Sequence, residues 1–240
     1  EHYARLLGLG EGWEVTEVDL DLPSQKVTIR LRRVPGSVCV CPGCGEARPL
    51  KDHAEERQWR HLDTMQFETV LVARTPRTNC PACGVLNVDL PWADPHGRFT
   101  LMFQAFAIRV LLASASIEQG RQLLGLSWHA AQDLMSVAVE RGLLVRDTQG
   151  ITEVGMDEKN FGQGQDYVSV LTDILGRRVL DVAPGRTRES ADALWNTLPQ
   201  EQKAEVQAVA LDMWPAFLAS AKAHVPQAKI VHDRFHISKH

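Results

Sequence analysis

VGMD at residues 154–157, VALD at 209–212 and KIVHD at 229–233 are three short apolar runs that each end on an aspartate. An apolar run that stops on Asp is typical of a core strand whose carboxylate emerges at the edge of the sheet, where a ligand can reach it. The alternative is that each Asp is the N-cap of a following helix. Because the pattern recurs, we favour the sheet-edge interpretation for Asp157 and Asp212, and leave Asp233 uncertain.

Working outward from these runs, the last third of the chain alternates strands and helices. We expect an antiparallel meander of three strands, a helix, a fourth strand, a second helix and a fifth strand. This order is the RNase H arrangement, in which the fourth strand lies parallel beside the first, so Asp157 and Asp212 would project side by side. The expected elements are strands at 151–157, 167–173 and 178–182, a helix at 187–198, a strand at 206–211, a helix at 213–224 and a strand at 229–232.

Two carboxylates on adjacent strands suit metal-assisted phosphoryl transfer. Oxygen ligands hold Mg²⁺ or Mn²⁺, and a pair of such ions activates an attacking hydroxyl and stabilises the leaving oxygen. Glu158 is adjacent to Asp157 and therefore points to the other face of its strand, so we expect it to pair with a cation. Asp173 and Asp181 are predicted to be turn and surface acids.

Four motifs in this order, VGMDE, DYVSVLTD, VALDMW and AKIVHDRFH, resemble the ISL3 family of bacterial insertion-sequence transposases. The resemblance extends to cysteine pairs near the amino terminus and covers nearly the whole chain. It implies a DDE transposase with an RNase H-like core, in which Asp157 and Asp212 are the first two catalytic acids and bind Mg²⁺ or Mn²⁺. It also implies double-stranded DNA as partner, both as the element's terminal repeats and as target, with a homo-oligomer forming on that DNA.

The third acid of the family is a glutamate beyond the Asp-Arg-Phe-His motif, whereas this sequence stops at His240. The resemblance therefore implies a partial core and a chain that is catalytically incomplete as given. Two other classes stay open, a transposase remnant that only binds DNA and a different RNase H-like nuclease.

The strongest local signal is a pair of cysteine knuckles, CPGCG at 41–45 and CPACG at 80–84. The glycine after each second cysteine tolerates positive φ, so backbone N–H groups can face the sulfurs while four thiolates converge on a tetrahedral ion. We predict a structural Zn²⁺ site in a zinc ribbon, with two disulfides as the main alternative. His53 and His61 are less favoured ligands, and Cys39 is expected to be a buried small residue. The zinc ligands are Cys41, Cys44, Cys80 and Cys83.

A basic and aromatic cluster lies between the two knuckles. Such clusters bind phosphates or stack on bases, so Arg57, Trp59, Arg60 and His61 are candidate DNA contacts. The alternative is that Trp59 packs in the core of the ribbon while the arginines are solvated. Residues 66–74 are expected to form a strand that returns the second knuckle to the first, and residues 15–34 to form two strands that turn at Pro23-Ser24.

Helical periodicity dominates the middle of the chain. One helix is expected at 101–113, a second from the N-cap Ser116 to Leu124 before Gly125, and a third from the N-cap Ser127 through Glu140. Helix, glycine-containing turn and helix predict a helix-turn-helix, although short helical hairpins are also common packing units. The exposed positions of the reading helix, and therefore the candidate DNA contacts, are Trp128, His129, Gln132 and Ser136.

These features predict a multidomain α+β protein with three parts. They are a β-rich zinc-ribbon DNA-binding domain at 1–95, a helix-turn-helix module at 96–148 and part of an RNase H-like α/β core at 149–240. The net charges of the three parts are −3, +1 and −2, within a total of −4, so a DNA-binding surface must be a local patch. No apolar run near 18 residues and no signal-peptide pattern occur, which predicts a cytoplasmic bacterial protein without membrane contact.

Overall fold

The computed structural model describes residues 2–10, 12–162, 164 and 166–232. The chain divides into two compact units, Glu1–Leu144 and Val145–His240. The predicted β-rich and helical parts thus share the first unit, and the division at residue 95 stays a prediction. No helix in the described part of the chain is long and apolar enough to cross a membrane.

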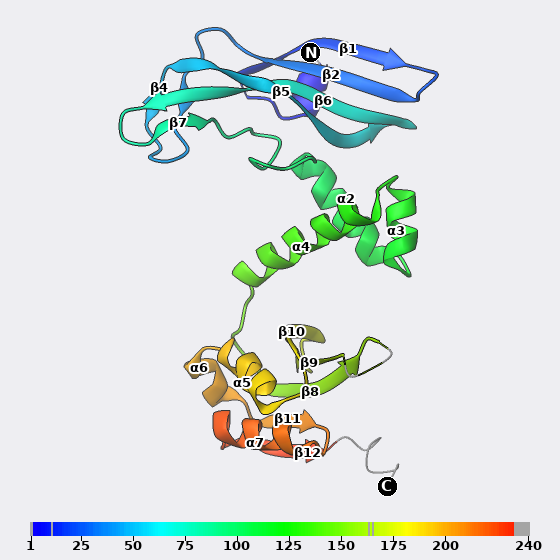
Figure 1. The fold of residues 1–240 in the computed structure, drawn as a ribbon, viewed down its shortest axis with the longest axis vertical. Coiled ribbons are helices and arrows are strands. Elements are labelled where there is room, and N and C mark those ends of the chain that lie inside the picture. The colour runs from blue at the N-terminus through cyan, green and yellow to red at the C-terminus, as the bar shows by residue number, and fades with distance from the viewer. Residues whose placement is uncertain (1, 11, 163, 165, 233–240) are drawn as a thin grey trace. The chain divides into compact units, whose positions relative to one another are not determined.

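The first unit contains a five-stranded sheet, which is preceded by helix α1 (His2–Leu6). Strands β1 and β2 form an antiparallel hairpin, β2 pairs with β6 in parallel, and β6 pairs with β5 and β7 in antiparallel fashion (Figure 1). The predicted hairpin is confirmed, and the strand predicted at 66–74 is part of the longer β6. The strands are β1 (Trp13–Asp21), β2 (Lys26–Arg33), β5 (Leu50–Thr64), β6 (Phe67–Cys80) and β7 (Gly84–Asn87).

One face of this sheet packs on a tryptophan cluster. Ile29 of β2 and Trp59 of β5 are fully buried there. The Trp92 ring lies edge-on to two others, with centroids 4.6 Å from Trp13 and 5.8 Å from Trp59. Large aromatic rings contribute both buried area and edge-to-face contacts, so this cluster anchors the sheet to the segment that follows β7.

Three helices complete the first unit: α2 (Leu101–Ala113), α3 (Ile117–Leu123) and α4 (Trp128–Leu144). As predicted, Ser116 and Ser127 cap helices, since their hydroxyl oxygens accept from the backbone N–H groups of Gln119 and Ala130, each at 3.2 Å. Gly125 ends the second helix with φ +63°. The helices share a small core that includes Phe103, Ala107, Leu124, Leu126, Ala130 and Leu134.

The second unit is a five-stranded sheet with helices packed on it. Its strand order is β10-β9-β8-β11-β12, with an antiparallel meander of β8, β9 and β10, and with β11 parallel to both β8 and β12 (Figure 1). This confirms the predicted order of strands and the parallel pairing of the first and fourth strands, whereas two helices, not the single predicted one, lie between the third and fourth strands. The strands are β8 (Glu153–Asn160), β9 (Tyr167–Asp173), β10 (Arg178–Pro184), β11 (Ala208–Leu211) and β12 (Lys229–His232).

Helices α5 (Arg188–Asn196), α6 (Gln200–Glu205) and α7 (Pro215–His224) join these strands. Trp195 of α5 and Phe217 of α7 are fully buried in one core cluster with Met156 of β8 and Leu211 of β11. Because side chains alternate along a strand, Asp157, which follows Met156 in β8, points to the opposite face of the sheet, and Asp212 directly follows the last residue of β11.

Candidate metal sites and nucleic-acid interface

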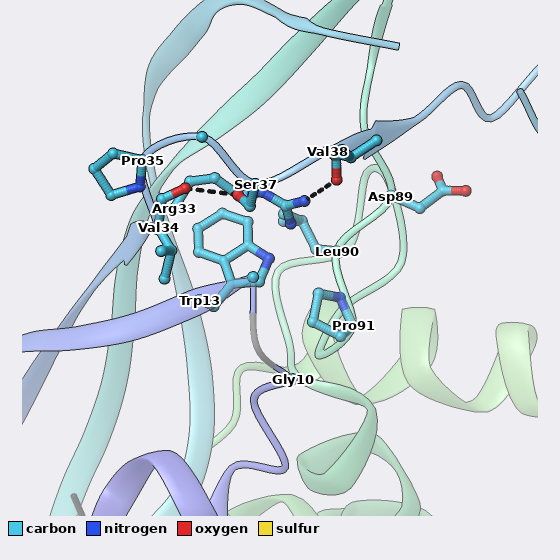
Figure 2. Close-up of a pocket in the computed structure, with 12 residues that line it drawn as sticks. Gly10, Trp13, Arg33, Val34, Pro35, Ser37, Val38, Asp89, Leu90 and Pro91 are labelled. Carbon is cyan, nitrogen blue, oxygen red and sulfur yellow. Dashed lines mark hydrogen bonds between the residues drawn. The ribbon is translucent and has the colours of Figure 1, made fainter. Parts of the chain in front are cut away.

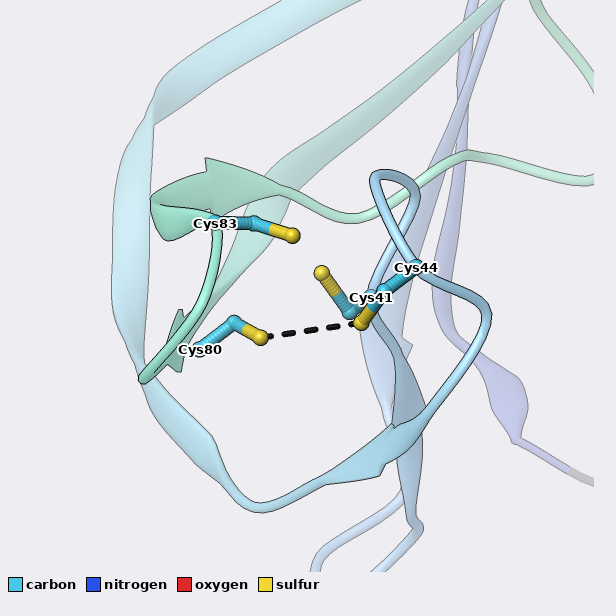
Figure 3. A group of neighbouring side chains, drawn as sticks. All are labelled: Cys41, Cys44, Cys80 and Cys83. Atoms are coloured by element: carbon cyan, nitrogen blue, oxygen red, sulfur yellow. Dashed lines mark hydrogen bonds between the residues drawn. The ribbon is translucent and has the colours of Figure 1, made fainter.

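Four cysteines converge at one end of the first unit. Cys41 and Cys44 belong to a loop between the short strands β3 (Cys39–Val40) and β4 (Ala47–Arg48), whereas Cys80 ends β6 and Cys83 precedes β7. Their sulfur atoms all lie within 4.8 Å of one another, and the Cys44 and Cys80 sulfurs are 3.6 Å apart (Figure 3). The two knuckles therefore form one group, as predicted from their spacing.

The backbone of the knuckles explains this convergence. The N–H of Gly45 donates to the Cys41 carbonyl at 2.9 Å, and the N–H of Cys41 donates to the Glu46 carbonyl at 2.9 Å. Gly45 and Gly84 have φ of +76° and +79°, a conformation that glycine adopts without strain. Each sequence CPxCG thus closes a tight turn that aims both of its thiols at the same point.

The chemistry of the donor set fits zinc. Backbone N–H groups of Cys83 and Ala82 lower the pKa of the Cys80 thiol to about 6, and the Arg48 guanidinium acts in the same direction. Burial raises the pKa of the Cys83 thiol to about 12, as expected where sulfurs crowd together without a cation. Tetrahedral zinc with bonds of about 2.3 Å has sulfur–sulfur edges of about 3.8 Å, so the observed group needs only slight contraction.

The other candidate zinc ligands are outside this group. Cys39 is fully buried and does not belong to it, as predicted. His61 lies in β5, where Nδ1 forms a 2.8 Å hydrogen bond with the Thr100 hydroxyl. His53 also lies in β5, opposite Pro76 of β6. In the described part of the chain the four cysteines are therefore sufficient to explain the site.

The basic and aromatic cluster of β5 is used inside the fold. Trp59 has no exposed surface, so the prediction that its ring stacks on a base is wrong for this structure, and the alternative of core packing is correct. The Arg57 guanidinium lies over the Trp59 ring, 5.0 Å from the centroid. It also donates to the carbonyl oxygens of Pro95 at 2.6 Å and Gly97 at 3.0 Å. Arg57 thus holds the segment that leads into the helices.

Arg60 and His61 have similar internal partners. The Arg60 side chain is 14% exposed, pairs with Asp63 at 2.5 Å and Glu68 at 3.6 Å, and lies 4.9 Å from the Phe103 ring centroid of α2. Burial, followed by the charge of Arg60, lowers the pKa of His61. These contacts join β5 to α2 and leave little of either side chain for DNA, which contradicts their predicted role as direct contacts.

The predicted reading helix presents its candidates outward. Trp128, His129, Gln132 and Ser136 are all exposed on α4, while Ala131 and Leu134 face the core. Asp133 lies among them, but it pairs with Arg98 at 2.6 Å, which reduces its repulsion of phosphate. The surface is therefore accessible to the major groove of DNA, and direct base contacts there stay a prediction.

The two candidate catalytic acids lie at matching positions of parallel neighbours. Leu211 of β11 is in register with Met156 of β8, and Asp212 and Asp157 are the residues that follow them, so that the two aspartates have matching places along neighbouring strands. Neither caps a helix, because the N-caps of α5 and α7 are Thr187 and Trp214. The N-cap alternative therefore does not apply to either aspartate. One oxygen of Asp157 accepts from the N–H of Glu158 at 2.8 Å, which leaves the carboxylate exposed.

The remaining acids have separate positions. Asp233 lies outside the described residues, so its role stays open. Asp173 closes the turn between β9 and β10, where it accepts from the N–H of Gly176 at 2.9 Å and from Arg178 at 3.0 Å, in agreement with its predicted turn role. Among the residues described, only the cysteines form a cluster of three or more potential metal ligands, so Asp157 and Asp212 supply two oxygen donors and no third.

A cavity of about 730 Å³ opens in the first unit near the start of β1, away from the cysteine group. Its polar atoms bond within its own wall: Arg33 donates to the Val38 carbonyl at 2.6 Å, and the Ser37 hydroxyl donates to the Val34 carbonyl at 2.6 Å (Figure 2). The Arg33 guanidinium also lies 5.6 Å from the Trp13 ring centroid. These contacts fix the loop that leads to the first knuckle.

Three sequence models from one transposase family match successive parts of the chain. Residues 37–83 match a zinc-finger of transposases IS204, IS1001, IS1096 and IS1165, and residues 88–136 match the helix-turn-helix domain of transposase family ISL3. Residues 154–240 match the transposase domain of the same family, which is of the DDE type. The matched segments contain the cysteine group, the helices and the carboxylate pair.

Curated relatives agree with these matches. A transposase for insertion sequence element IS1001 from Bordetella parapertussis is 31% identical over 233 residues, which are 96% of this chain and 57% of that protein. A transposase for IS1557 from Mycobacterium tuberculosis is 25% identical over 243 residues, which are 98% of this chain and 54% of that protein. The chain thus spans about half the length of these relatives. Since the zinc ribbon, the helix-turn-helix and the DDE fold occur here in the order of one family, the chain belongs to the ISL3 family of insertion-sequence transposases.

Proposed function

We propose that this chain binds the ends of an insertion sequence and contributes two catalytic carboxylates to metal-dependent DNA cleavage and strand transfer. The parallel register of β8 and β11 is the observation that supports the proposal most, because Met156 and Leu211, the residues before Asp157 and Asp212, are paired, while Asp157 is exposed and Asp212 is half-buried. Acids that served only as caps or solvated surface charges would need no such match between strands that are distant in the sequence.

The role of each acid follows from its position. Asp157 and Asp212 are oxygen donors that share divalent cations, and Mg²⁺ or Mn²⁺ when bound would activate a hydroxyl and stabilise a leaving oxygen. The buried residues Met156 and Leu211, each adjacent to one acid, hold both strands against α5 and α7. This packing keeps the two carboxylates at a fixed separation, which a shared cation requires.

The first unit supplies DNA recognition in this proposal. The exposed side chains of α4 contact base edges in the major groove, and the zinc-bound knuckles and the tryptophan cluster keep the sheet beside them rigid. An insertion sequence has two ends, so we propose that two or more copies of the chain assemble when both ends are bound.

Strand-transfer assays with the complete gene product test the catalytic part. Replacement of either acid in Asp157→Asn or Asp212→Asn removes one ligand charge with little change of shape. Loss of several kcal/mol of transition-state stabilisation corresponds to at least about 100-fold slower cleavage and joining, while DNA binding is retained. The matched control is Asp181→Asn in β10 of the same sheet, since the Asp181 carboxylate accepts from the next backbone N–H at 2.8 Å as Asp157 does. Near-normal joining by either first variant would disprove the assignment.

A further inference from the structure

An exposed ion pair lies beside the outward face of α4. The Arg98 Nη2 is 2.6 Å from the Asp133 carboxylate, and the two side chains are 63% and 64% exposed. A guanidinium carries five N–H groups. Among the described residues that one carboxylate is the only acceptor of the Arg98 side chain, which otherwise lies 5.8 Å from the Phe99 ring centroid. Most of the N–H groups of Arg98 are therefore available to a ligand.

The position of Asp133 on α4 places this pair at the predicted reading surface. Asp133 follows His129 by four residues and precedes Ser136 by three, and these spacings put side chains on one face of a helix. All three are exposed, whereas Leu134 is buried. Because a contact of 2.6 Å joins it to Asp133, the Arg98 guanidinium lies at the edge of the same face.

The loop that carries Arg98 is held in place by β5. The N–H of Arg60 donates to the Arg98 carbonyl, and the N–H of Thr100 donates to the Arg60 carbonyl, both at 2.9 Å. On the other side of Arg98, the Gly97 carbonyl accepts from the Arg57 guanidinium at 3.0 Å. These bonds fix the backbone on both sides of Arg98, so little further ordering of this loop is needed when DNA binds.

We propose that Arg98 reads a guanine in the major groove, with Asp133 as the positioning residue that orients its guanidinium. This inference rests on the proposed function, in which α4 contacts base edges. Arginine matches the O6 and N7 acceptors of guanine with two N–H groups, which is the commonest specific contact of a side chain with a base. The carboxylate of Asp133 accepts from another N–H and so limits rotation of the guanidinium plane.

The charge of the pair favours a base over a phosphate as the ligand. Arg98 and Asp133 together carry no net charge, and the carboxylate repels any phosphate that approaches the guanidinium. The O6 and N7 atoms of guanine are uncharged acceptors, so this repulsion does not oppose their approach. Contact with a phosphate is the competing outcome, and it differs from base contact in its dependence on sequence and salt.

The first measurement locates the base. The whole chain is titrated with duplexes of the element's terminal repeat in which 7-deazaguanine, which lacks the N7 acceptor, replaces each guanine in turn. At one position the replacement should weaken binding of the unaltered chain about tenfold and leave binding by Arg98→Gln unchanged, because that variant no longer makes the contact. Arg98→Lys keeps the charge without the planar fork and should lose the same sensitivity.

The matched control is Arg32→Gln in β2. Arg32 pairs with Glu14 at 2.7 Å and is also 63% exposed, so the substitution removes an equally exposed, paired arginine from another element. This variant should retain the full sensitivity to 7-deazaguanine. Circular dichroism and the melting temperature check the fold of every variant.

The second measurement tests the role of Asp133. Asp133→Asn should lose much of the preference for that guanine, and it should bind an unrelated duplex at least as tightly as the unaltered chain, because a negative charge has been removed. A carboxylate that only repelled DNA would behave differently. Its removal would raise the affinity for every duplex and leave the preference for guanine unchanged, and that result would overturn the positioning role.

Two results would overturn the role of Arg98 while leaving the proposed function intact. The first is an identical response of the unaltered chain and Arg98→Gln to every 7-deazaguanine. The second is weaker binding of Arg98→Gln to all duplexes, with the slope of log affinity against log salt reduced by about 0.9, which would identify a phosphate contact. Absence of DNA binding by the unaltered chain would overturn both the inference and the proposed recognition of DNA, whereas joining activity in Asp157→Asn would overturn only the catalytic assignment.

Discussion

Gly155 occupies a position in β8 where a methyl group does not fit. A Cβ there would lie 2.5 Å from the Thr172 hydroxyl oxygen of β9, whereas the next contact, to Ile174, would be 3.6 Å. That hydroxyl donates to the Gly155 carbonyl at 3.2 Å, so the threonine cannot rotate away without losing its hydrogen bond. Gly155→Ala therefore forces either β8 or Thr172 to move, two residues before Asp157.

The cost of this substitution can be worked out. Overpacking costs about 1–3 kcal/mol, and the lower backbone entropy of alanine returns about 0.5–1 kcal/mol. The difference between these ranges is about 0–2.5 kcal/mol, and because the 2.5 Å approach is severe we expect about 1–2 kcal/mol, which corresponds to a fall of roughly 4–16 °C in the melting temperature of a unit of this size. Differential scanning calorimetry measures the shift, and hydrogen exchange in β8 assigns it to the second unit.

Two further variants make the experiment decisive. Thr172→Ala added to Gly155→Ala should recover part of the loss, because it removes the atom that clashes. Gly142→Ala in α4 is the matched control, since no atom lies within 4 Å of its added Cβ and it should stabilise the helix by about 0.5–1 kcal/mol. A melting temperature for Gly155→Ala at or above that of the unaltered chain would refute the packing argument.

Three other outcomes are expected. Metal analysis of the purified protein should find one zinc ion per chain. Cys80→Ser should abolish zinc binding and lower the melting temperature of the first unit. Four freely titratable thiols in the native protein would exclude the zinc site. Burial lowers the pKa of His61 below its unfolded value, so the unfolded state binds the proton more readily than the folded state. The free energy of unfolding should therefore fall as the pH drops below about 6.5, and this loss should be smaller in His61→Asn. The Arg57 guanidinium donates to backbone carbonyls, so Arg57→Ala should lower the melting temperature of the first unit without changing the salt dependence of DNA binding. A weaker salt dependence in this variant would mean that Arg57 contacts a phosphate.

The second unit was largely predictable because its strands are short apolar runs bounded by acids and turns. The predicted strands at 167–173 and 229–232 match β9 and β12, and the apolar runs before Asp157 and Asp212 form the paired strands β8 and β11. Helix α6 was missed, since QEQKAE is only six residues long and has no apolar stripe. Its fold depends on tertiary contacts, such as the 2.8 Å bond from Gln202 to the Ile151 carbonyl.

The first unit was harder to predict because its sheet contains a long polar strand. Strand β5 has no regular apolar alternation, and its register with β6 shifts at three places. The local hydrophobic pattern therefore gives little indication of this strand or of its pairing. The same strand misled the functional prediction, because a tryptophan flanked by arginines has the same composition whether it meets DNA or a protein core. Only the burial of Trp59 distinguishes the two.

The partners of the arginines in the first unit bear on the proposed binding of DNA. Most arginines of the first unit already have acceptors, so no large patch of unpaired arginines occurs in the described part of that unit. Under the proposed function, the affinity of α4 for DNA should then depend on shape and base contacts more than on counterion release, and we expect selective binding with a modest salt dependence. The arginines of the first unit with ion-pair partners are Arg30, Arg32, Arg60, Arg77, Arg98, Arg121 and Arg141.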